Sequence, residues 1–265
     1  MASINYRLNN IASALFIKYG STERTYIIDK IEIIKTNLKT SFGTDIKEIL
    51  VFGSFKRDTI LPRTFDENSD IDILVVFNNA DKEYTPETYR TKLKKFADFK
   101  YSTSTVIKDH PSVVLEMNKI KFDLVPSRLV DSFFSSTYQI PNKSGSWMDT
   151  DPSGFNKKIT DANTTYGSIV KPIVRLFKRW NSQNGYPFSS FELENIIADV
   201  NFSGDNYETG FLYAIKQISS YGLGVVATKK VETLKSNGKW ITEYIDRDNQ
   251  EKAIEVACRI LGIRP

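Results

Sequence analysis

Two aspartates two positions apart follow a glycine-serine pair, and these residue types at this spacing could bind a metal-bound phosphate chain. Asp70 and Asp72 lie in the apolar run Ser-Asp-Ile-Asp-Ile-Leu-Val-Val. Strand side chains alternate between faces, so both carboxylates would project from one face of a strand. Adjacent negative charges are unfavourable without a cation, and hard oxygen ligands favour Mg²⁺. Gly53-Ser54 could bring backbone N–H groups close to a phosphate, because glycine has no side chain.

Each feature alone has a simpler interpretation, since an Asp-x-Asp pair is usually solvated and Gly-Ser is usually a turn. A third element strengthens the functional interpretation. Residues 113–117 and 120–125 alternate in polarity around Asn118-Lys119, which predicts a β-hairpin. Asp123 lies in its second strand and could complete a trio of carboxylates. Three such groups can hold two divalent ions about 3.5–4 Å apart, the arrangement used for in-line attack on phosphorus.

Other segments must position these residues. Strands are expected near 46–52 and 70–77, and a helix is expected from Pro86 to about residue 101. Ser21-Thr22 offers an N-cap for a helix with apolar residues at 4-3-4 spacing that ends at Gly43. Residues 141–154 are rich in turn formers and are interpreted as a linker. Beyond it, helices are expected at about 165–183, 189–199, 207–220 and 248–262.

The motifs resemble those of the DNA polymerase β-like nucleotidyltransferases, and within them the cGAS/DncV-like group of bacterial cyclic-oligonucleotide synthases (CD-NTases). The resemblance covers about residues 45–200. The first three of its five motifs mark the superfamily and the last two mark the group: 53–59, 69–72, 122–126, 176–180 and 188–194. The loop 60–69 is long for the superfamily, and its Asp66 and Glu67 are interpreted as solvated.

The resemblance implies an α+β fold: a polymerase β-like nucleotidyltransferase lobe with a mixed sheet, packed against a helical lobe with the ligand cleft between them. Residues 1–150, including N-terminal spine helices, would form the catalytic lobe, and residues 151–265 would form the helical lobe.

The resemblance also implies roles for individual residues. Two Mg²⁺ ions, or Mn²⁺ in their place, would be held by the catalytic carboxylates Asp70, Asp72 and Asp123. The triphosphate would be bound by Gly53, Ser54, Lys178 and Ser190. Apart from the resemblance, Asn163 stands just before the basic helix and could read a base edge by hydrogen bonding.

Spacing alone favours simpler roles for the residues of the helical lobe. Lys178 lies on the basic arc of an amphipathic helix, which is usually solvated. Ser189 could be an N-cap, although a helix start beside Ser190 also attracts anions. Tyr186 is one of four aromatic candidates for stacking on a base, with Phe55, Trp147 and Tyr166, although most aromatic residues are core.

The implied reaction joins nucleoside triphosphates (ATP, GTP or pyrimidine nucleotides) into a cyclic di- or trinucleotide and releases pyrophosphate. The product would be a second messenger in bacterial anti-phage (CBASS) signalling, sensed by an effector protein. One alternative is transfer to another acceptor, such as an antibiotic, a tRNA end or a protein. The other is a catalytically silent module that binds nucleotides or RNA.

Composition narrows the remaining possibilities. The chain has 265 residues, a formal net charge of +4, one cysteine and one histidine. One histidine excludes zinc sites with several His or Cys ligands. Cys258 cannot form an internal disulfide and is expected in the core of the last helix, which fits the cytoplasm. The basic residues form only small clusters, interpreted as solvated, and apolar runs are short. We therefore expect a monomer with neither a membrane span nor a long nucleic-acid activator.

Overall fold

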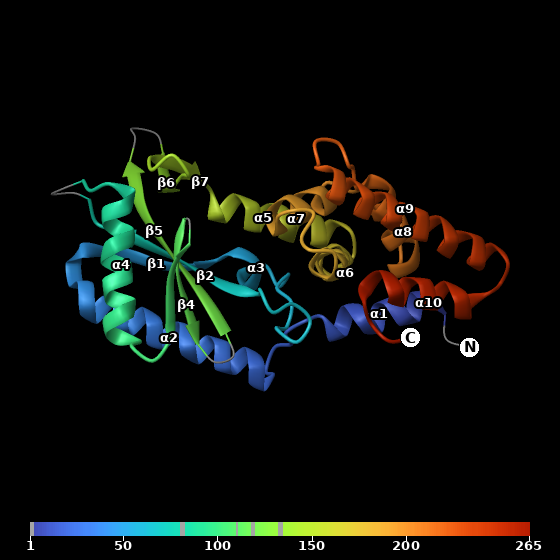
Figure 1. The fold of residues 1–265 in the computed structure, drawn as a ribbon, viewed down its shortest axis with the longest axis horizontal. Coiled ribbons are helices and arrows are strands. Elements are labelled where there is room, and N and C mark those ends of the chain that lie inside the picture. The colour runs from blue at the N-terminus through green and yellow to red at the C-terminus, as the bar shows by residue number, and fades with distance from the viewer. Residues whose placement is uncertain (1–2, 80–82, 110, 118–119, 132–134) are drawn as a thin grey trace. The chain divides into compact units, whose positions relative to one another are not determined.

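The structure is a computed structural model that describes residues 3–79, 83–109, 111–117, 120–131 and 135–265 (Figure 1). The chain forms two compact units. The sheet unit comprises Ile17–Arg63 and Glu67–Asn156, and the helical unit comprises residues up to Phe16, Thr64–Asp66 and Lys157–Pro265. His110 and the predicted turn Asn118-Lys119 lie outside the described residues.

The sheet unit is built on one mixed sheet, as the sequence predicted. The pairing of β2 with β5 is parallel, and the other pairings are antiparallel. The predicted hairpin is confirmed, because Val113 pairs with Leu124 and Met117 with Ile120. Along the sheet the order is β1 (Ile46–Phe52), β2 (Asp70–Phe77), β5 (Ile120–Asp131), β4 (Ser112–Met117) and β3 (Thr105–Asp109), with β6 (Ser136–Pro141) and β7 (Trp147–Thr150) continuing from β5.

One face of this sheet carries the main core of the unit. Helices α2 (Thr22–Phe42) and α4 (Pro86–Lys100) pack on it. The side chain of Ser21 caps α2, and Gly43 ends it, as predicted. The buried residues of α2 are those at the predicted 4-3-4 spacing: Ile27, Ile31, Ile34 and Leu38. Burial of this apolar stripe therefore holds α2 against the sheet.

The opposite face of the sheet is polar at one end and apolar at the other. Leu74, Val76 and Val125 form a small buried cluster on it. Because side chains alternate along a strand, Asp70 and Asp72 share this face with Leu74, while Ile71 and Ile73 belong to the main core. The alternation expected of this strand is confirmed.

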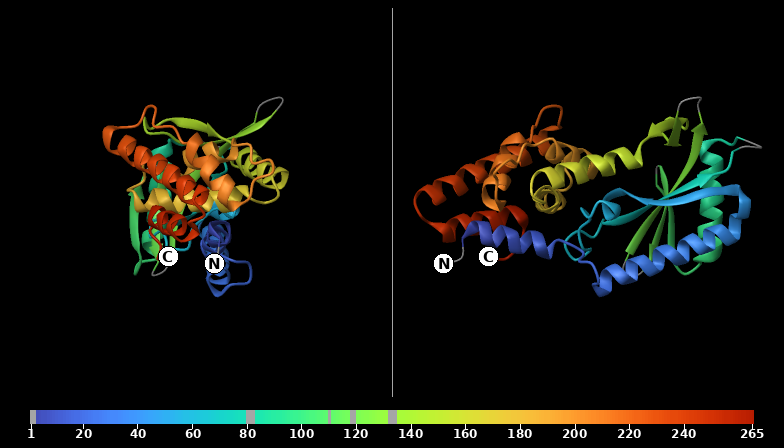
Figure 2. Two further views of the ribbon diagram at one scale, coloured as in Figure 1. Left: turned by 90° about the vertical axis from the view of Figure 1, so that its right-hand side faces the viewer. Right: turned by 180° about the vertical axis from the view of Figure 1, so that it is seen from behind.

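The helical unit is organised around α6 (Val170–Gln183), in which even the charged residues Arg175, Lys178 and Arg179 are buried. Figure 2 shows α9 and α10 running side by side at the C-terminal end of the chain. The helices of the unit are α1 (Ile4–Ala14), α5 (Pro152–Thr165, whose first turn belongs to the sheet unit), α6, α7 (Ser190–Ala198), α8 (Tyr207–Gln217), α9 (Val225–Asp246) and α10 (Gln250–Leu261). Cys258 is fully buried in α10, as expected.

The compact units differ in three places from the predicted division at residue 150, the first being residues 151–156, which belong to the sheet unit. Helix α1 belongs to the helical unit, because it packs against α6, α8 and α10 and buries Ile4 and Leu8 completely. The short segment Thr64–Asp66 belongs to the same unit. The predicted division into domains 1–150 and 151–265 itself stays a prediction.

Three segments were interpreted wrongly: α5, which the sequence did not predict as a helix, and the two described next. The predicted linker 141–154 contains strand β7, which pairs with β6, and the first turn of α5. Helix α9 was not predicted, although Val231, Leu234, Gly238 and Ile241 form a buried stripe at helical spacing. A glycine usually weakens a helix, but Gly238 allows close packing of α9 against α8, since a Cβ there would lie 3.0 Å from Ile215 Cγ2.

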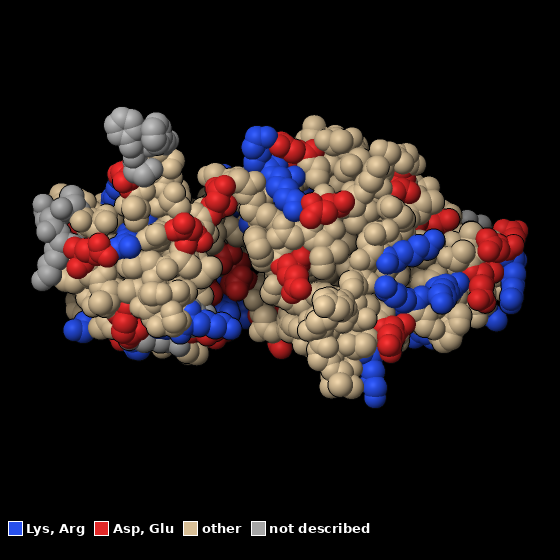
Figure 3. Space-filling view, turned by 90° about the horizontal axis from the view of Figure 1, so that it is seen from above, with Lys and Arg blue, Asp and Glu red and all other residues tan. Residues whose placement is uncertain are grey.

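In the described part of the chain, we find no helix with the length and hydrophobicity needed to cross a bilayer. On the face shown in Figure 3, basic and acidic side chains are interspersed over the surface.

Candidate active site

The acidic residues of the site lie on two neighbouring parallel strands. Asp70 and Asp72 are on β2, and Asp123 is on β5. In the register of the two strands, Asp72 pairs with Asp123 and Asp70 pairs with Lys121. Paired residues on neighbouring strands about 4.8 Å apart project from the same face. The structure therefore confirms that the three aspartates share one face.

Asp123 is held in an unusual environment for a carboxylate. Ser112 Oγ donates a hydrogen bond of 3.0 Å to Asp123 Oδ2. The other oxygen, Oδ1, is buried and has no hydrogen-bond partner among the described residues. Burial raises the pKa of Asp123, while Lys121 and Ser112 act in the opposite direction. A buried carboxylate oxygen without a hydrogen-bond partner lowers the stability of the fold, and a cation beside it would offset that loss.

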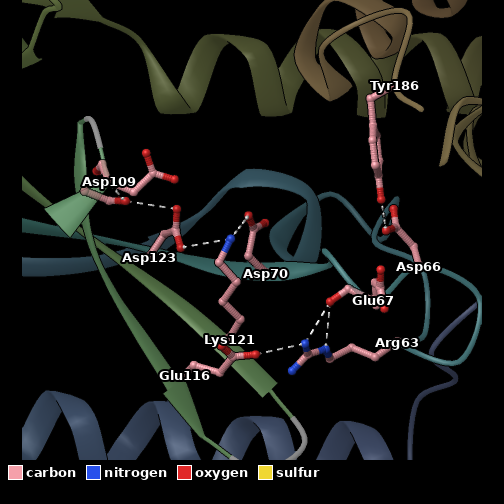
Figure 4. A network of polar contacts seen from close by, with 10 residues as sticks. Arg63, Asp66, Glu67, Asp70, Asp109, Glu116, Lys121, Asp123 and Tyr186 are labelled. Atoms are coloured by element: carbon pink, nitrogen blue, oxygen red, sulfur yellow. Dashed lines mark hydrogen bonds and ion pairs between the residues drawn. The ribbon is translucent and has the colours of Figure 1, made fainter. Parts of the chain in front are cut away.

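A positive charge already lies among these groups. Figure 4 shows the ammonium group of Lys121 between Asp70 and Asp123. Its Nζ is 4.0 Å from Asp70 Oδ2 and 4.0 Å from Asp123 Oδ1. As placed, no three His, Cys, Asp or Glu side chains within the described ranges converge closely enough to hold a metal ion. The donor set still fits a divalent ion, because hard carboxylate oxygens surround a place that already accepts positive charge.

Sequence reasoning missed Lys121, although the signal was available. Lys121 stands two positions before Asp123, so the same alternation that placed the aspartates on one face also places Lys121 there.

Gly53 packs directly against the acidic face. It begins the short helix α3 (Gly53–Lys56) after β1, with φ at +68°. A Cβ at this position would lie 1.7 Å from Asp72 Oδ2. Ser54 is buried next to it, and its carbonyl oxygen accepts hydrogen bonds from the N–H groups of Thr59 (3.0 Å) and Ile60 (3.2 Å). Only glycine fits the first position of this turn.

In the helical unit, the predicted phosphate-binding lysine is part of a buried ion pair. Lys178 Nζ lies 3.2 Å from Glu194 Oε1, with side-chain exposures of 6% and 0%. Ser190 is the first residue of α7 and is exposed, while Ser189 is the N-cap that accepts from the Glu192 N–H. Ser190 and Glu194 are four residues apart on one helix and therefore share a face. Lys178 is thus bound to the helix that Ser190 begins, one turn further along it.

Asn163 has a structural role. Its Oδ1 accepts a hydrogen bond of 2.9 Å from the Lys171 N–H, which links α5 to the start of α6. Packing also accounts for candidates proposed to stack on a base: Phe55 is buried in the sheet unit's core and Tyr166 contacts Phe202. The Tyr186 hydroxyl donates to Asp66 Oδ1 at 2.5 Å.

The interpretation of Asp66 as solvated was wrong. Its exposed fraction is 8%, because the segment carrying it packs with the helical unit.

Comparison with known proteins places the chain in a family. Residues 2–163 match the Second Messenger Oligonucleotide or Dinucleotide Synthetase domain, more than half of the chain. The chain belongs to this family. A probable cyclic nucleotide synthase of Bacillus cereus is 27% identical over 209 residues, covering 66% of this chain and 62% of that protein. A cyclic AMP-AMP-AMP synthase of Acinetobacter is 30% identical over 184 residues, covering 64% and 51%. This synthetase-domain chain thus spans between half and two thirds of the length of these curated relatives.

Solved structures establish the fold of this synthetase-domain protein. The Bradyrhizobium diazoefficiens CD-NTase CdnG, solved in complex with GTP, matches with a TM-score of 0.72 at 12% identity over 98% of this chain and 97% of that one. Vibrio cholerae DncV, a cyclic AMP-GMP synthase, matches with a TM-score of 0.62 at 15% identity, covering 81% and 68%. The expected polymerase β-like α+β fold is therefore confirmed.

Proposed function

We propose that the protein is a metal-dependent nucleotidyltransferase that joins nucleoside triphosphates into a cyclic di- or trinucleotide and releases pyrophosphate. One observation carries this proposal. Gly53 contacts Asp72, and Asp72 is the register partner of Asp123 on the neighbouring strand. A tight turn that can approach a phosphate chain is thereby joined to a carboxylate cluster, in a chain that matches the Second Messenger Oligonucleotide or Dinucleotide Synthetase domain.

The carboxylates Asp70, Asp72 and Asp123 would hold two Mg²⁺ ions, or Mn²⁺ in their place. Bound there, the metal would lower the pKa of the attacking ribose hydroxyl and neutralise charge on the leaving pyrophosphate. Lys121 would withdraw from the position between Asp70 and Asp123 when metal binds. Its side chain is 23% exposed, so solvent is accessible to it.

Four residues would orient the triphosphate. Gly53 and Ser54 offer the tight turn, and Lys178 and Ser190 offer an ammonium and a hydroxyl on neighbouring helices. Glu194 fixes the ammonium of Lys178 before substrate arrives, and such preorganisation favours transfer because little reorganisation remains. The second nucleotide would be the acceptor, and a repeat of the transfer would close the ring. Asn163 would read a base edge through its NH₂ group, since its oxygen is engaged with Lys171.

The biological setting follows from the relatives. A CBASS oligonucleotide cyclase of Escherichia coli is 25% identical over 218 residues. We propose that this chain acts in anti-phage (CBASS) defence as a cytoplasmic monomer, and that an effector protein senses its product. Residues 1–150 and 151–265 would be the catalytic and helical domains of the enzyme.

The decisive experiment gives the purified protein Mg²⁺ and the four nucleoside triphosphates, singly and mixed, without any other acceptor. Released pyrophosphate and the mass of the products are measured. The proposal expects small cyclic products resistant to phosphatase. Products that appear only with an added antibiotic, tRNA or protein would favour the other-acceptor alternative. Salt-sensitive RNA binding without pyrophosphate release would favour a silent binding module.

A further inference from the structure

The long loop between the glycine-serine turn and the aspartate pair contains a short segment, Thr64–Asp66, that we name the strap. The strap packs with the helical unit, although the residues before and after it belong to the sheet unit. Asp66 at its end is a charged residue with an exposed fraction of only 8%. Burying a carboxylate requires partners that compensate its lost hydration.

Two residues of the helical unit hold the strap: Tyr186 contacts the carboxylate of Asp66, and Arg179 contacts Phe65. Tyr186 Oη donates to Asp66 Oδ1 at 2.5 Å (Figure 4). Arg179 donates through Nη1 to the Phe65 carbonyl oxygen, and its guanidinium lies over the Phe65 ring, 5.6 Å from the ring centroid. Tyr186 adopts a φ of +57°, a conformation that is unfavourable for a residue with a side chain. The strap is therefore held by specific contacts.

Arg179 is itself fixed by the end of the chain. Its Nε donates to the Leu261 carbonyl oxygen at 2.9 Å, and Nη2 donates to that of Gly262 at 3.0 Å. Burial lowers the pKa of the Arg179 guanidinium, and the neighbouring Asp66 opposes that shift. The planar guanidinium of Arg179 thus joins the strap to the end of α10 through several N–H groups in fixed directions, which the single ammonium of a lysine could not reproduce.

The residues on either side of the strap, Arg63 and Glu67, are hydrogen-bonded to each other within the sheet unit. Arg63 donates to the Glu67 carbonyl oxygen through Nε at 3.1 Å and Nη2 at 2.8 Å. Arg63 Nη2 also pairs with Glu116 Oε1 at 3.4 Å (Figure 4). Glu116 is the register partner of Lys121, the residue between the carboxylates. The chain therefore leaves and re-enters the sheet unit at a fixed point.

In the sequence, both the strap residue Asp66 and its anchor Arg179 lie close to residues proposed to bind the metal or the nucleotide. Glu67, Asn68 and Ser69 alone separate Asp66 from Asp70, and Arg179 directly follows Lys178. We propose that Tyr186 and Arg179 are positioning residues that, by holding the strap, fix the start of the short segment that leads into Asp70 and so support the binding of a nucleoside triphosphate at the acidic face. This inference rests on the proposed function, because it assigns the strap a role in the binding of that substrate.

The test measures triphosphate affinity and stability together. Tyr186→Phe removes one hydroxyl and keeps the ring, and Asp66→Asn keeps the shape and removes the charge. Tyr213→Phe is the matched control, because Tyr213 lies partly exposed on α8, outside the strap network. Both strap variants should raise the KM for the triphosphate fivefold to twentyfold, with kcat within twofold. The double variant should lose no more than the stronger single one, because both changes break the same contact.

Equilibrium binding of ATP and GTP with Ca²⁺ in place of Mg²⁺ gives a second readout that needs no turnover. The dissociation constant should rise by the same factor in both strap variants and stay unchanged in Tyr213→Phe. If wild-type protein binds and turns over triphosphate while the strap variants keep wild-type KM and affinity, the inference is overturned and the proposed function stands. A change in the unfolding temperature alone, with unchanged KM and affinity, would overturn the inference in the same way. Wild-type protein that neither binds ATP or GTP nor releases pyrophosphate would overturn the proposed function, and the inference with it.

Discussion

Each of the two units holds a lysine against carboxylates, and the two arrangements are built differently. In the sheet unit, Lys121 lies 4.0 Å from both Asp70 and Asp123, and one oxygen of Asp123 has no hydrogen-bond partner in the described structure. In the helical unit, Lys178 lies 3.2 Å from Glu194, and both side chains are almost fully buried. The first lysine balances the negative charge of two carboxylates at 4.0 Å, whereas the second belongs to a closer, buried pair.

The difference indicates which charge can move. A buried pair is costly to separate, because each partner then lacks compensation for its lost hydration. A partly exposed ammonium 4.0 Å from its partners gains little from them and can return to water. We therefore expect Lys121 to be displaced by a cation and Lys178 to remain in place.

The largest effect should follow from neutralising the acidic cluster. Asp123→Asn or Asp72→Asn should reduce pyrophosphate release by about 10³-fold or more, because metal-assisted charge stabilisation is lost. Circular dichroism and the unfolding temperature should show a folded protein. Asp98→Asn, on the exposed face of α4, is the control and should be fully active. Activity retained in Asp123→Asn would remove the metal assignment.

The buried pair can be tested by removing one partner. Lys178→Met should lower the free energy of unfolding by about 3–5 kcal/mol, since Glu194 would keep a buried charge without its ion-pair partner. Adding Glu194→Gln should restore part of that loss. Lys157→Met is a suitable control, because Lys157 and Asp161 form an exposed pair whose loss should cost less than about 1 kcal/mol. Urea unfolding measures all four proteins, and equal values for Lys178→Met and Lys157→Met would contradict the buried-pair interpretation.

Part of the acidic face could be predicted because its information is local. Alternation within one strand placed Asp70 and Asp72 together, and the hairpin pattern located the strand that carries Asp123. The cap Ser21 and the stop Gly43 set the limits of α2 for the same reason. The parallel pairing that sets Asp123 beside Asp72 joins distant segments, and no local pattern signals it.

The partners of distant residues could not be predicted in this way. Burial of Asp66 depends on Tyr186, which is 120 residues away in the sequence, and nothing near Asp66 signals that contact. The ion pair of Lys178 depends likewise on how α6 packs against α7. Helix α9 was not predicted, and the close approach of Ile215 accounts for the glycine at position 238 in its middle. Tertiary packing overrides local propensity at such positions.

Gly53 tests how tightly the turn must approach the acidic face. Gly53→Ala should lower the free energy of unfolding by about 1–2 kcal/mol through its positive φ, and by a further amount of about 1–3 kcal/mol through the contact with Asp72. Gly145→Ala is the matched control in the same unit, because Gly145 has a φ of +83° and open space around it. A similar loss in both variants would show that the contact with Asp72 is unimportant.

The smallest effect concerns Lys121 itself and distinguishes the two lysines most directly. Lys121→Met should cost about 1 kcal/mol or less without Mg²⁺, because its Nζ lies 4.0 Å from each carboxylate and its own side chain is partly exposed. Mg²⁺ should then raise the unfolding temperature more in the variant than in wild type, since the ion no longer competes with the ammonium. Lys94→Met, which breaks the exposed pair with Asp98 on α4, should show the wild-type response to Mg²⁺. An equal response in Lys121→Met and wild type would mean that Lys121 does not occupy the position of the cation.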